Sequence, residues 1–314
     1  MYSYVLSGKE YLVYSSGRFL VITSCTDWTQ KAIMHEDKIV CLDMRDKLCV
    51  TGTIGGRIIL WDLEFFEQKV NIQMPNGSIN FSSISLSGKY IFCTDSILPN
   101  NNVYCYDLRT TKMRARGSLG SFEPTLKGVS WGSNFHVTVC ADGVWFSRYV
   151  EAEGEKLEIT KGMFRIYPKT SMTCVAVVDE TYVISGSIDG YVFLWAHLQC
   201  QKAIKVADCA VSEMCLYKKN LIVSNFNDNV RVFSYKIHKK KNMEEDEKKN
   251  GEITEDFVTI VIDSYEKAPL QSVLVSKLDE SIYYAQTRSG VIYNKMIPAP
   301  EYFNKISSYG QTNK

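Results

Sequence analysis

Short strand-like runs that contain an aromatic residue near their end recur along this chain at nearly regular intervals. They occupy residues 57–62, 103–107, 143–146, 191–195, 230–233 and 291–293. The aromatic markers of the first five runs are Trp61, Tyr106, Phe146, Trp195 and Phe233, so that successive markers are 45, 40, 49 and 38 positions apart. The runs are rich in Val, Ile, Tyr and Phe and are bounded by Gly, Asn, Asp and Ser, which is typical of strands and turns. Helix signals are nearly absent, so the chain repeats one β-structured unit.

A four-stranded unit repeated about every 40–45 residues, with an aromatic near the end of its third strand, is typical of a WD40-type propeller blade. Residues 2–6, 11–14, 18–23 and 30–34 form a further unit before the first Trp marker. Seven units then account for nearly all of the 314 residues. Because a single blade would leave a hydrophobic sheet face exposed, neighbouring blades must stack and the ring must close. We therefore predict an all-β fold, a single seven-bladed WD40-type β-propeller over residues 1–314 with four antiparallel strands per blade.

One interval is longer than the others, because 60 positions separate Phe233 from Tyr293. A segment rich in Lys and Glu, residues 238–256, accounts for the excess and has blocks of like charge without apolar periodicity. Such a composition predicts a solvated, disordered insertion between the third and fourth strands of its blade. The alternative is that its lysine cluster contacts an acidic surface of a partner.

The overall composition limits the classes of function. Lys and Arg number 36 and Asp and Glu number 35, so the net charge of +1 provides no general attraction for nucleic acid. The apolar runs are only as long as strands, which argues against membrane insertion. The first residues lack a basic region followed by an apolar core, so we expect no secretory signal. The ten cysteines include no C-x-x-C pair and lie mostly in apolar runs, which predicts reduced structural thiols in a cytoplasmic protein.

The best-formed repeat is Ser185–Trp195, in which Asp189-Gly190 is typical of a tight hairpin turn. WD40 blades often contain a buried hydrogen-bond network of a turn Asp, a strand hydroxyl, a loop His and the Trp. Asp189, Ser185 and Trp195 match three of these places, but residues 168–171 include no His. In an earlier repeat His35 and Trp61 match, although Gly55 stands where the Asp is expected. The residues predicted to have structural roles are Trp61, Ser185, Asp189, Gly190 and Trp195.

No set of residues predicts catalysis. His136, His197 and His238 are scattered, and no nucleophile–base set or metal-ligand spacing occurs. The glycine-rich run 52–56 precedes a strand, so it cannot place a phosphate at a helix N-terminus. We therefore predict no enzyme, no cofactor and no metal site. An enzymatic propeller with carboxylates or a metal ion around its central channel is the least favoured alternative.

Several motifs in order resemble one family of WD40 proteins. They are Gln30 followed by His35-Glu36-Asp37 and Cys41-Leu42, then Gly162-Met163-Phe164 followed by Cys174-Val175, then Ser185–Trp195, and the hairpin at 94–104. From about Gly8 onward the chain resembles the first propeller of the echinoderm microtubule-associated protein-like family. It departs from the family pattern at Met34, where the family has Gly, and at Ala207-Asp208-Cys209, where the family has Ala-His. The resemblance implies a cytoskeletal scaffold that binds tubulin or microtubules.

The competing hypothesis is a general peptide-binding adaptor of a ubiquitin-ligase or trafficking complex, which would use the mouth of the central channel. Under either hypothesis we expect a monomer. Under the scaffold hypothesis, loops on the narrow face of the ring contact the protein partner. The predicted partner-binding residues are His35, Glu36, Asp37, Arg57, Asp189, Asp228 and Arg288.

Overall fold

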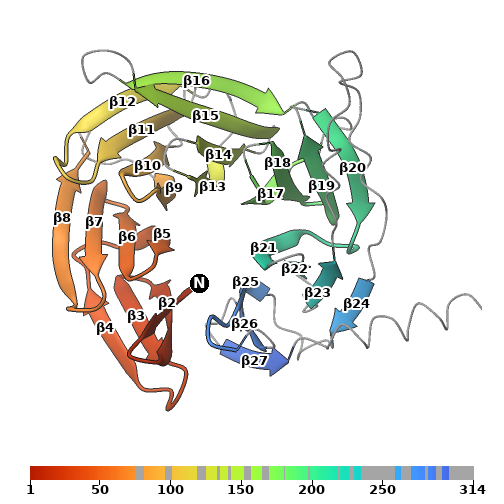
Figure 1. Cartoon of the computed structure of the whole chain (residues 1–314), viewed down its shortest axis with the longest axis horizontal. Helices are drawn as coiled ribbons and strands as arrows, with labels where there is room; N and C mark the ends of the chain where they lie inside the picture. The colour runs from red at the N-terminus through yellow and green to blue at the C-terminus, as the bar shows by residue number, and fades with distance from the viewer. Residues whose placement is uncertain are drawn as a thin grey trace, which may run out of the picture.

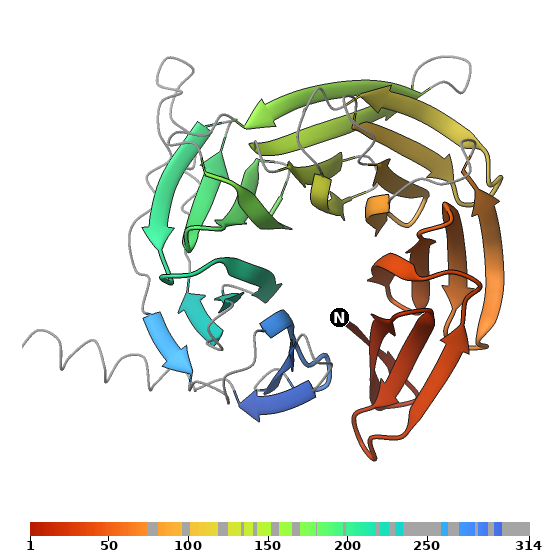
Figure 2. The same ribbon diagram turned by 180° about the vertical axis from the view of Figure 1, so that it is seen from behind.

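The structure is a computed structural model. It describes residues 1–74, 81–95, 101–118, 125–132, 135–140, 143–151, 157–164, 170–179, 181–196, 199–217, 220–225, 230–234, 259–262, 270–279, 282–287 and 292–296. The described strands form seven antiparallel sheets, six with four strands and one with three. Seen from either side, the sheets follow one another around a ring, and the N-terminal end lies near its centre (Figures 1 and 2). The fold is thus all-β, as the sequence predicts, and consists of repeated antiparallel sheets.

In each sheet the strands follow the chain order from the inside of the ring outward. The first three sheets consist of β1 (Tyr2–Leu6), β2 (Lys9–Ser16), β3 (Phe19–Ser24) and β4 (Gln30–Met34); of β5 (Ile39–Arg45), β6 (Leu48–Thr53), β7 (Arg57–Asp62) and β8 (Glu67–Gln73); and of β9 (Phe81–Leu86), β10 (Tyr90–Asp95), β11 (Asn102–Asp107) and β12 (Met113–Ser118). The fourth and fifth sheets consist of β13 (Thr125–Trp131), β14 (Phe135–Cys140), β15 (Gly143–Glu151) and β16 (Leu157–Phe164); and of β17 (Met172–Val177), β18 (Tyr182–Ser187), β19 (Tyr191–Ala196) and β20 (Gln199–Lys205). The last two consist of β21 (Val211–Tyr217), β22 (Asn220–Asn225), β23 (Val230–Ser234) and β24 (Thr259–Ile262); and of β25 (Leu270–Val275), β26 (Ile282–Thr287) and β27 (Ile292–Met296).

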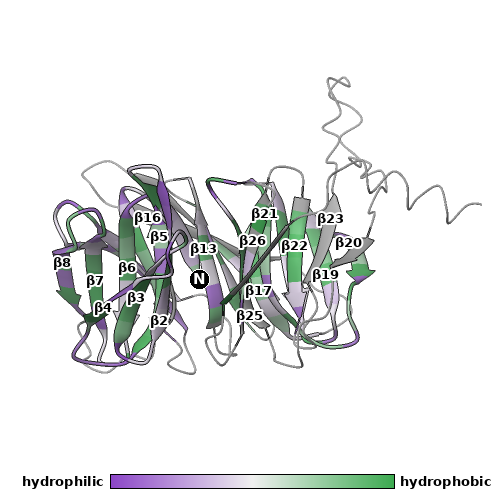
Figure 3. Cartoon of the chain, turned by 90° about the horizontal axis from the view of Figure 1, so that it is seen from below, coloured by the Kyte–Doolittle hydropathy of each residue, from purple (hydrophilic) through white to green (hydrophobic). Residues whose placement is uncertain are grey.

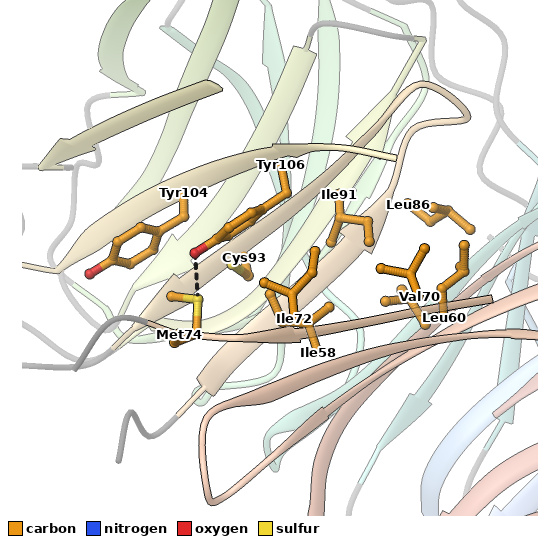
Figure 4. Close-up of a cluster of buried hydrophobic side chains, with 11 residues drawn as sticks. Ile58, Leu60, Val70, Ile72, Met74, Leu86, Ile91, Cys93, Tyr104 and Tyr106 are labelled. Atoms are coloured by element: carbon orange, nitrogen blue, oxygen red, sulfur yellow. Dashed lines mark hydrogen bonds between the residues drawn. The ribbon is translucent and has the colours of Figure 1, made fainter. Parts of the chain in front are cut away.

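The hydrophobic core lies between consecutive sheets. Between the second and third sheets, Ile58 and Leu60 pack against Ile91 and other residues of the third sheet, and the Tyr106 hydroxyl donates to the sulfur of Met74 at 2.9 Å (Figure 4). Because the middle strands are covered on both faces, five of the six residues of β6 are buried, and β7 contains a continuous buried apolar run from Ile58 to Trp61. In Figure 3 hydrophobic residues lie along the strands, and hydrophilic residues are concentrated in the turns. Stacking of the sheets therefore buries what each sheet alone would expose.

A common register relates six of the sheets. The second residue of each inner strand from β5 to β25 forms a one-residue bulge against the second strand. In this register Trp61, Tyr106, Trp195 and Phe233 occupy one equivalent position. In the fourth and last sheets, however, Ser147 and Lys295 hold it, so the markers Phe146 and Tyr293 are displaced by one and two residues. Since side chains alternate across a strand, Phe146 points to the opposite face of its sheet from the Trp markers.

The first and last sheets are in contact. Leu12 on β2 packs with Leu274 on β25 and Tyr284 on β26. Glu10, which is only 2% exposed, accepts hydrogen bonds from Ser276 Oγ at 2.5 Å, from the Lys277 backbone N–H at 2.7 Å and from the Tyr284 hydroxyl at 3.4 Å. In the second sheet, the residue at the position of Glu10 is Cys49, which packs toward the sheet before it. The first sheet thus packs on the last sheet as the second packs on the first.

Three further expectations can be compared with the structure. β23 and β24 pair with each other, but residues 235–258 lie outside the described residues. This range includes His238 and the whole of the predicted insertion at 238–256, and His197 is not described either. All ten cysteines are free, and Cys49, Cys93, Cys105, Cys140 and Cys174 are buried. Within the described part of the chain, no helix is long and apolar enough to cross a membrane.

Candidate functional site

Two regions of the ring could bind a partner. The first is the face at which the inner strands begin and the second and third strands of each sheet are joined, which we call the hairpin face. The chain direction in each sheet places the 35–38 connection, the 54–56 turn and the 188–190 turn on this face. The second region is a cavity between the inner strands.

A buried network supports the hairpin face of the second sheet. Trp61 Nε1 donates to His35 Nε2 at 3.2 Å, and the same nitrogen lies 3.0 Å from Thr51 Oγ1. The hydroxyl of Thr51 is also 3.3 Å from the carbonyl oxygen of Ile59. Burial lowers the pKa of His35, so the imidazole is neutral at pH 7. The network holds the β4–β5 connection against the sheet and has no solvent-exposed nucleophile.

The fifth sheet contains a shorter version of this network. Trp195 Nε1 donates to Ser185 Oγ at 2.8 Å, and this hydroxyl in turn donates to the sulfur of Met172 at 3.2 Å. Asp189 lies apart from the pair, because it is exposed in the hairpin turn and accepts a hydrogen bond from Thr170 Oγ1 at 2.5 Å. Gly190 follows with φ of +79°, and a Cβ atom there would lie 2.0 Å from the carbonyl oxygen of Ala207. Only glycine fits that position.

The second and fifth sheets each have one acidic side chain near this hairpin, but they carry it on different loops. In the common register Asp37 corresponds to Thr170, and Gly55 corresponds to Asp189. In the second sheet the carboxylate of Asp37 fills the space beside Gly55, where a Cβ atom would meet it at 2.2 Å. In the fifth sheet the acid stands on the hairpin and the hydroxyl on the preceding connection. Thus the missing turn Asp at Gly55 is replaced in space by Asp37.

Of the predicted partner-binding residues, four lie together on the second sheet. Arg57 Nη1 is 2.8 Å from Glu36 Oε2, and Arg18 Nη1 donates to the backbone oxygen of Glu36 at 3.3 Å. The Glu36 side chain is 72% exposed, so this pair contributes about 1 kcal/mol or less to stability. His35 is buried in the network, whereas Asp37 is half-buried. Asp189 stands on the fifth sheet, and the third and fourth sheets separate it from this group. Asp228 and Arg288 lie outside the described residues.

Apolar side chains also reach solvent on the hairpin face. Ile54 and Ile188 occupy the same place in the hairpins of the second and fifth sheets and are 45% and 54% exposed. Val40 and Leu126 are exposed at the bulge position of β5 and β13. None of these four residues is among those that the sequence predicts to bind a partner. In the sequence such residues could be found as branched apolar residues at the tip of a predicted hairpin or at the second position of an inner strand.

The central cavity has a volume of about 780 Å³. Its walls come from the inner strands and include Val129, Val175, Val177, Met214 and Val275, which make most of the lining apolar. This volume lies within the range of pockets that hold small molecules or side chains, roughly 300–1,000 Å³.

A charged cluster interrupts the apolar wall. The Nζ of Lys127 on β13 pairs with Oε1 of Glu213 on β21 across the intervening strand β17. Asp43 on β5 also lines the cavity and accepts a hydrogen bond from the Leu86 N–H at 2.7 Å. Lys127 and Glu213 each directly follow the bulge residue, so they lie at the same level of the ring. A charged residue in an otherwise uncharged inner strand is the signal that could have identified them in the sequence.

The protonation of these groups follows from their surroundings. Burial acts to lower the pKa of Lys127, but the Glu213 carboxylate outweighs it, so the pKa is raised and the ammonium stays charged. Burial raises the pKa of Asp43, and the Leu86 N–H opposes the rise. Burial also raises the pKa of the Cys174 thiol to about 12, which keeps this neighbour protonated and unreactive. In the part of the chain that is described, no group of three His, Cys, Asp or Glu side chains could hold a metal ion.

Comparison with known proteins places the fold. No family model matches the chain, and no curated protein matches it. Among solved structures, the β-propeller domain of Cps50 (Swd1) from Myceliophteria thermophila is 14% identical, with 84% of this chain and 83% of that one covered and a TM-score of 0.66. The WD40 repeats of RRP9 are 12% identical, cover 89% of this chain and 83% of that one, and give a TM-score of 0.64. U3-55K is also 12% identical, covers 89% and 84%, and gives 0.62.

This chain has the WD40 β-propeller fold. At such low identity the likeness concerns the fold alone. No comparison supports membership of the echinoderm microtubule-associated protein-like family, which is therefore based only on the motifs of the sequence.

Proposed function

We propose that this propeller is a non-enzymatic, cytoplasmic scaffold that binds a protein partner through its hairpin face. The observation that carries the proposal is the exposure of Ile54 and Ile188 at equivalent hairpin tips. On the first sheet, Phe19 and Met34 pair across neighbouring strands near the same face and are exposed as well. Large apolar side chains that recur on one face, next to charged groups such as Glu36 and Arg57, resemble the mixture found in protein interfaces.

We further propose that the seven sheets are the seven blades of a closed, monomeric ring. The contacts of Glu10 and Leu12 with the last sheet support closure, because they repeat the packing found between other consecutive sheets. A closed ring would hold the hairpins in fixed relative positions, which reduces the ordering cost when a partner binds.

The partner can be of two kinds. The family resemblance favours tubulin or microtubules, whereas the WD40 fold as such is equally compatible with an adaptor in a ubiquitin-ligase or trafficking complex. Salt-dependent co-sedimentation with polymerised tubulin separates the two. Pelleting above background at low salt supports the cytoskeletal scaffold, and its absence together with a stable non-cytoskeletal partner supports the adaptor.

The test of the binding face uses the double variant Ile54→Glu/Ile188→Glu. It should lose the partners that the wild-type chain captures from native cells, because it places two charges on the apolar positions. The control is Phe65→Glu, which changes an exposed aromatic residue in the β7–β8 turn on the other face. Equal capture by the wild type and the double variant would refute the proposal, as would loss of capture only in the control.

A further inference from the structure

The charges inside the ring are few and unequal. Among the residues of the inner strands, only Asp43, Arg45, Lys127 and Glu213 are charged. Arg45 ends its strand and is exposed, and it is not part of the cavity lining. The cavity wall therefore presents two carboxyl groups and one ammonium at the level of the inner strands. Lys277 also lines the cavity, but it follows the last inner strand and is exposed to solvent.

One further amine lies in the cavity. Burial lowers the pKa of the Met1 α-amino group to about 6, although the carboxylates of Glu213 and Asp43 oppose this. At pH 7 most of this amine is uncharged. Burial also raises the pKa of Asp43, so a cation beside this carboxyl group would favour its ionised form. Lys127 and Glu213 are 28% and 17% exposed, which shows that solvent in the cavity reaches the pair. A cationic group that enters the cavity could therefore reach Glu213 without first unfolding the wall.

We propose that the central cavity takes up a lysine or arginine side chain of the protein partner, whose cationic end pairs with Glu213 and Asp43. The aliphatic part of such a side chain would lie along Val129, Val175 and Val177. Because the pair would be partly buried in the cavity, its charges would attract each other more strongly than a fully exposed pair. The inference rests on the proposed scaffold function and adds the chemistry by which the cavity would recognise its partner.

The experiment measures small probes on the full chain by isothermal titration calorimetry. The cationic probes are N-acetyl-arginine amide and N-acetyl-lysine amide, and the comparison probes are the norleucine and glutamate analogues. We expect a cationic probe to bind at least ten-fold more tightly than either comparison probe. Glu213→Gln should weaken it about ten-fold, whereas Lys127→Met should strengthen it several-fold because Glu213 loses its internal partner. The exposed Glu67→Gln variant serves as the control and should change nothing.

The outcomes are decisive in both directions. Binding of the cationic probes no tighter than norleucine, equal binding by Glu213→Gln, or weaker binding by Lys127→Met would each overturn the inference, provided that circular dichroism shows a folded variant. The hairpin-face variant Ile54→Glu/Ile188→Glu should bind the probes normally, since it does not touch the cavity. Failure of probe binding with intact partner capture would therefore refute the cavity site alone. Loss of partner capture in Glu213→Gln would identify a side chain of the partner, rather than a free amine or guanidine, as the source of the cation that enters the cavity.

Discussion

The carboxylate of Glu10 provides a quantitative test of the proposed closure of the ring between the first and last sheets. Glu10→Ala removes the acceptor for Ser276, Lys277 and Tyr284, which belong to the last sheet and its turn. These three residues lie 266 to 274 positions after Glu10 in the sequence. Any energetic coupling between them and Glu10 must therefore pass through the contact of the first and last sheets. The variant removes no contact within the first sheet's own strand ladder.

The magnitude follows from the hydrogen bonds. Two of the three are short, at 2.5 and 2.7 Å, and a hydrogen bond to a charged group is worth about 1.5–3 kcal/mol. Allowing for the desolvation of the carboxylate that the variant avoids, the net loss in free energy of unfolding should be about 3 kcal/mol. With about 2 cal/mol/K of unfolding entropy per residue over this chain, the melting temperature should fall by about 5 °C.

The assay is urea denaturation of Glu10→Ala, of Ser276→Ala and of the double variant. If the two side chains interact, the two losses should be non-additive, with a coupling energy of about 1–2 kcal/mol. Glu67→Ala is the matched control, because its carboxylate lies in a largely exposed pair with Lys69, at 3.4 Å, and should change stability by less than about 1 kcal/mol. Additivity within about 0.5 kcal/mol would refute the closure of the ring through Glu10.

Three further predictions concern the supports of the fold. Burial lowers the pKa of His136 to about 3, so the folded chain binds a proton at this imidazole less readily than the unfolded chain. The free energy of unfolding should therefore fall as the pH drops from about 6.5 toward 3, by up to about 1.4 kcal/mol per pH unit. In urea titrations, His136→Phe should flatten this slope. Gly190→Ala places a methyl group 2.0 Å from a backbone oxygen at a residue with positive φ, so thermal melts should show a loss of at least about 2 kcal/mol in the free energy of unfolding. Gly8→Ala, which has open space around the added methyl group, should lose only about 1 kcal/mol. Thr51→Val keeps the side-chain volume but removes the hydroxyl beside His35, so chemical denaturation should show a loss of about 1–2 kcal/mol.

The sequence predicted the repeated sheets because their signal is local. Each third strand has its own apolar run and its own turn residues, and the markers Trp61, Tyr106, Trp195 and Phe233 do share one position. The prediction chose wrong marker positions in the fourth and last sheets, where the nearest aromatic is not at the equivalent position. Only the pairing register shows this, since Ser147 and Lys295 carry no apolar signal there.

The candidate sites depended on contacts that the sequence does not display. The pairing of Lys127 with Glu213 joins residues 86 positions apart, and it arises only when β13, β17 and β21 lie side by side. The exchange of Asp37 for the missing turn acid at Gly55 likewise depends on two loops meeting in space. Local patterns therefore predicted the repeated sheets, whereas the cavity and the contacts of Glu10 with the last sheet depend on how distant sheets are arranged in space.

The most direct test of the account is the footprint of a captured partner by amide hydrogen exchange. We predict that the partner slows exchange in the hairpin turns 54–57 and 188–191, while the β7–β8 turn at 63–66 and the last sheet's turn at 276–279 exchange as in the free chain. Protection confined to those opposite turns, or spread along the outer strands β8 and β20, would contradict binding through the hairpin face.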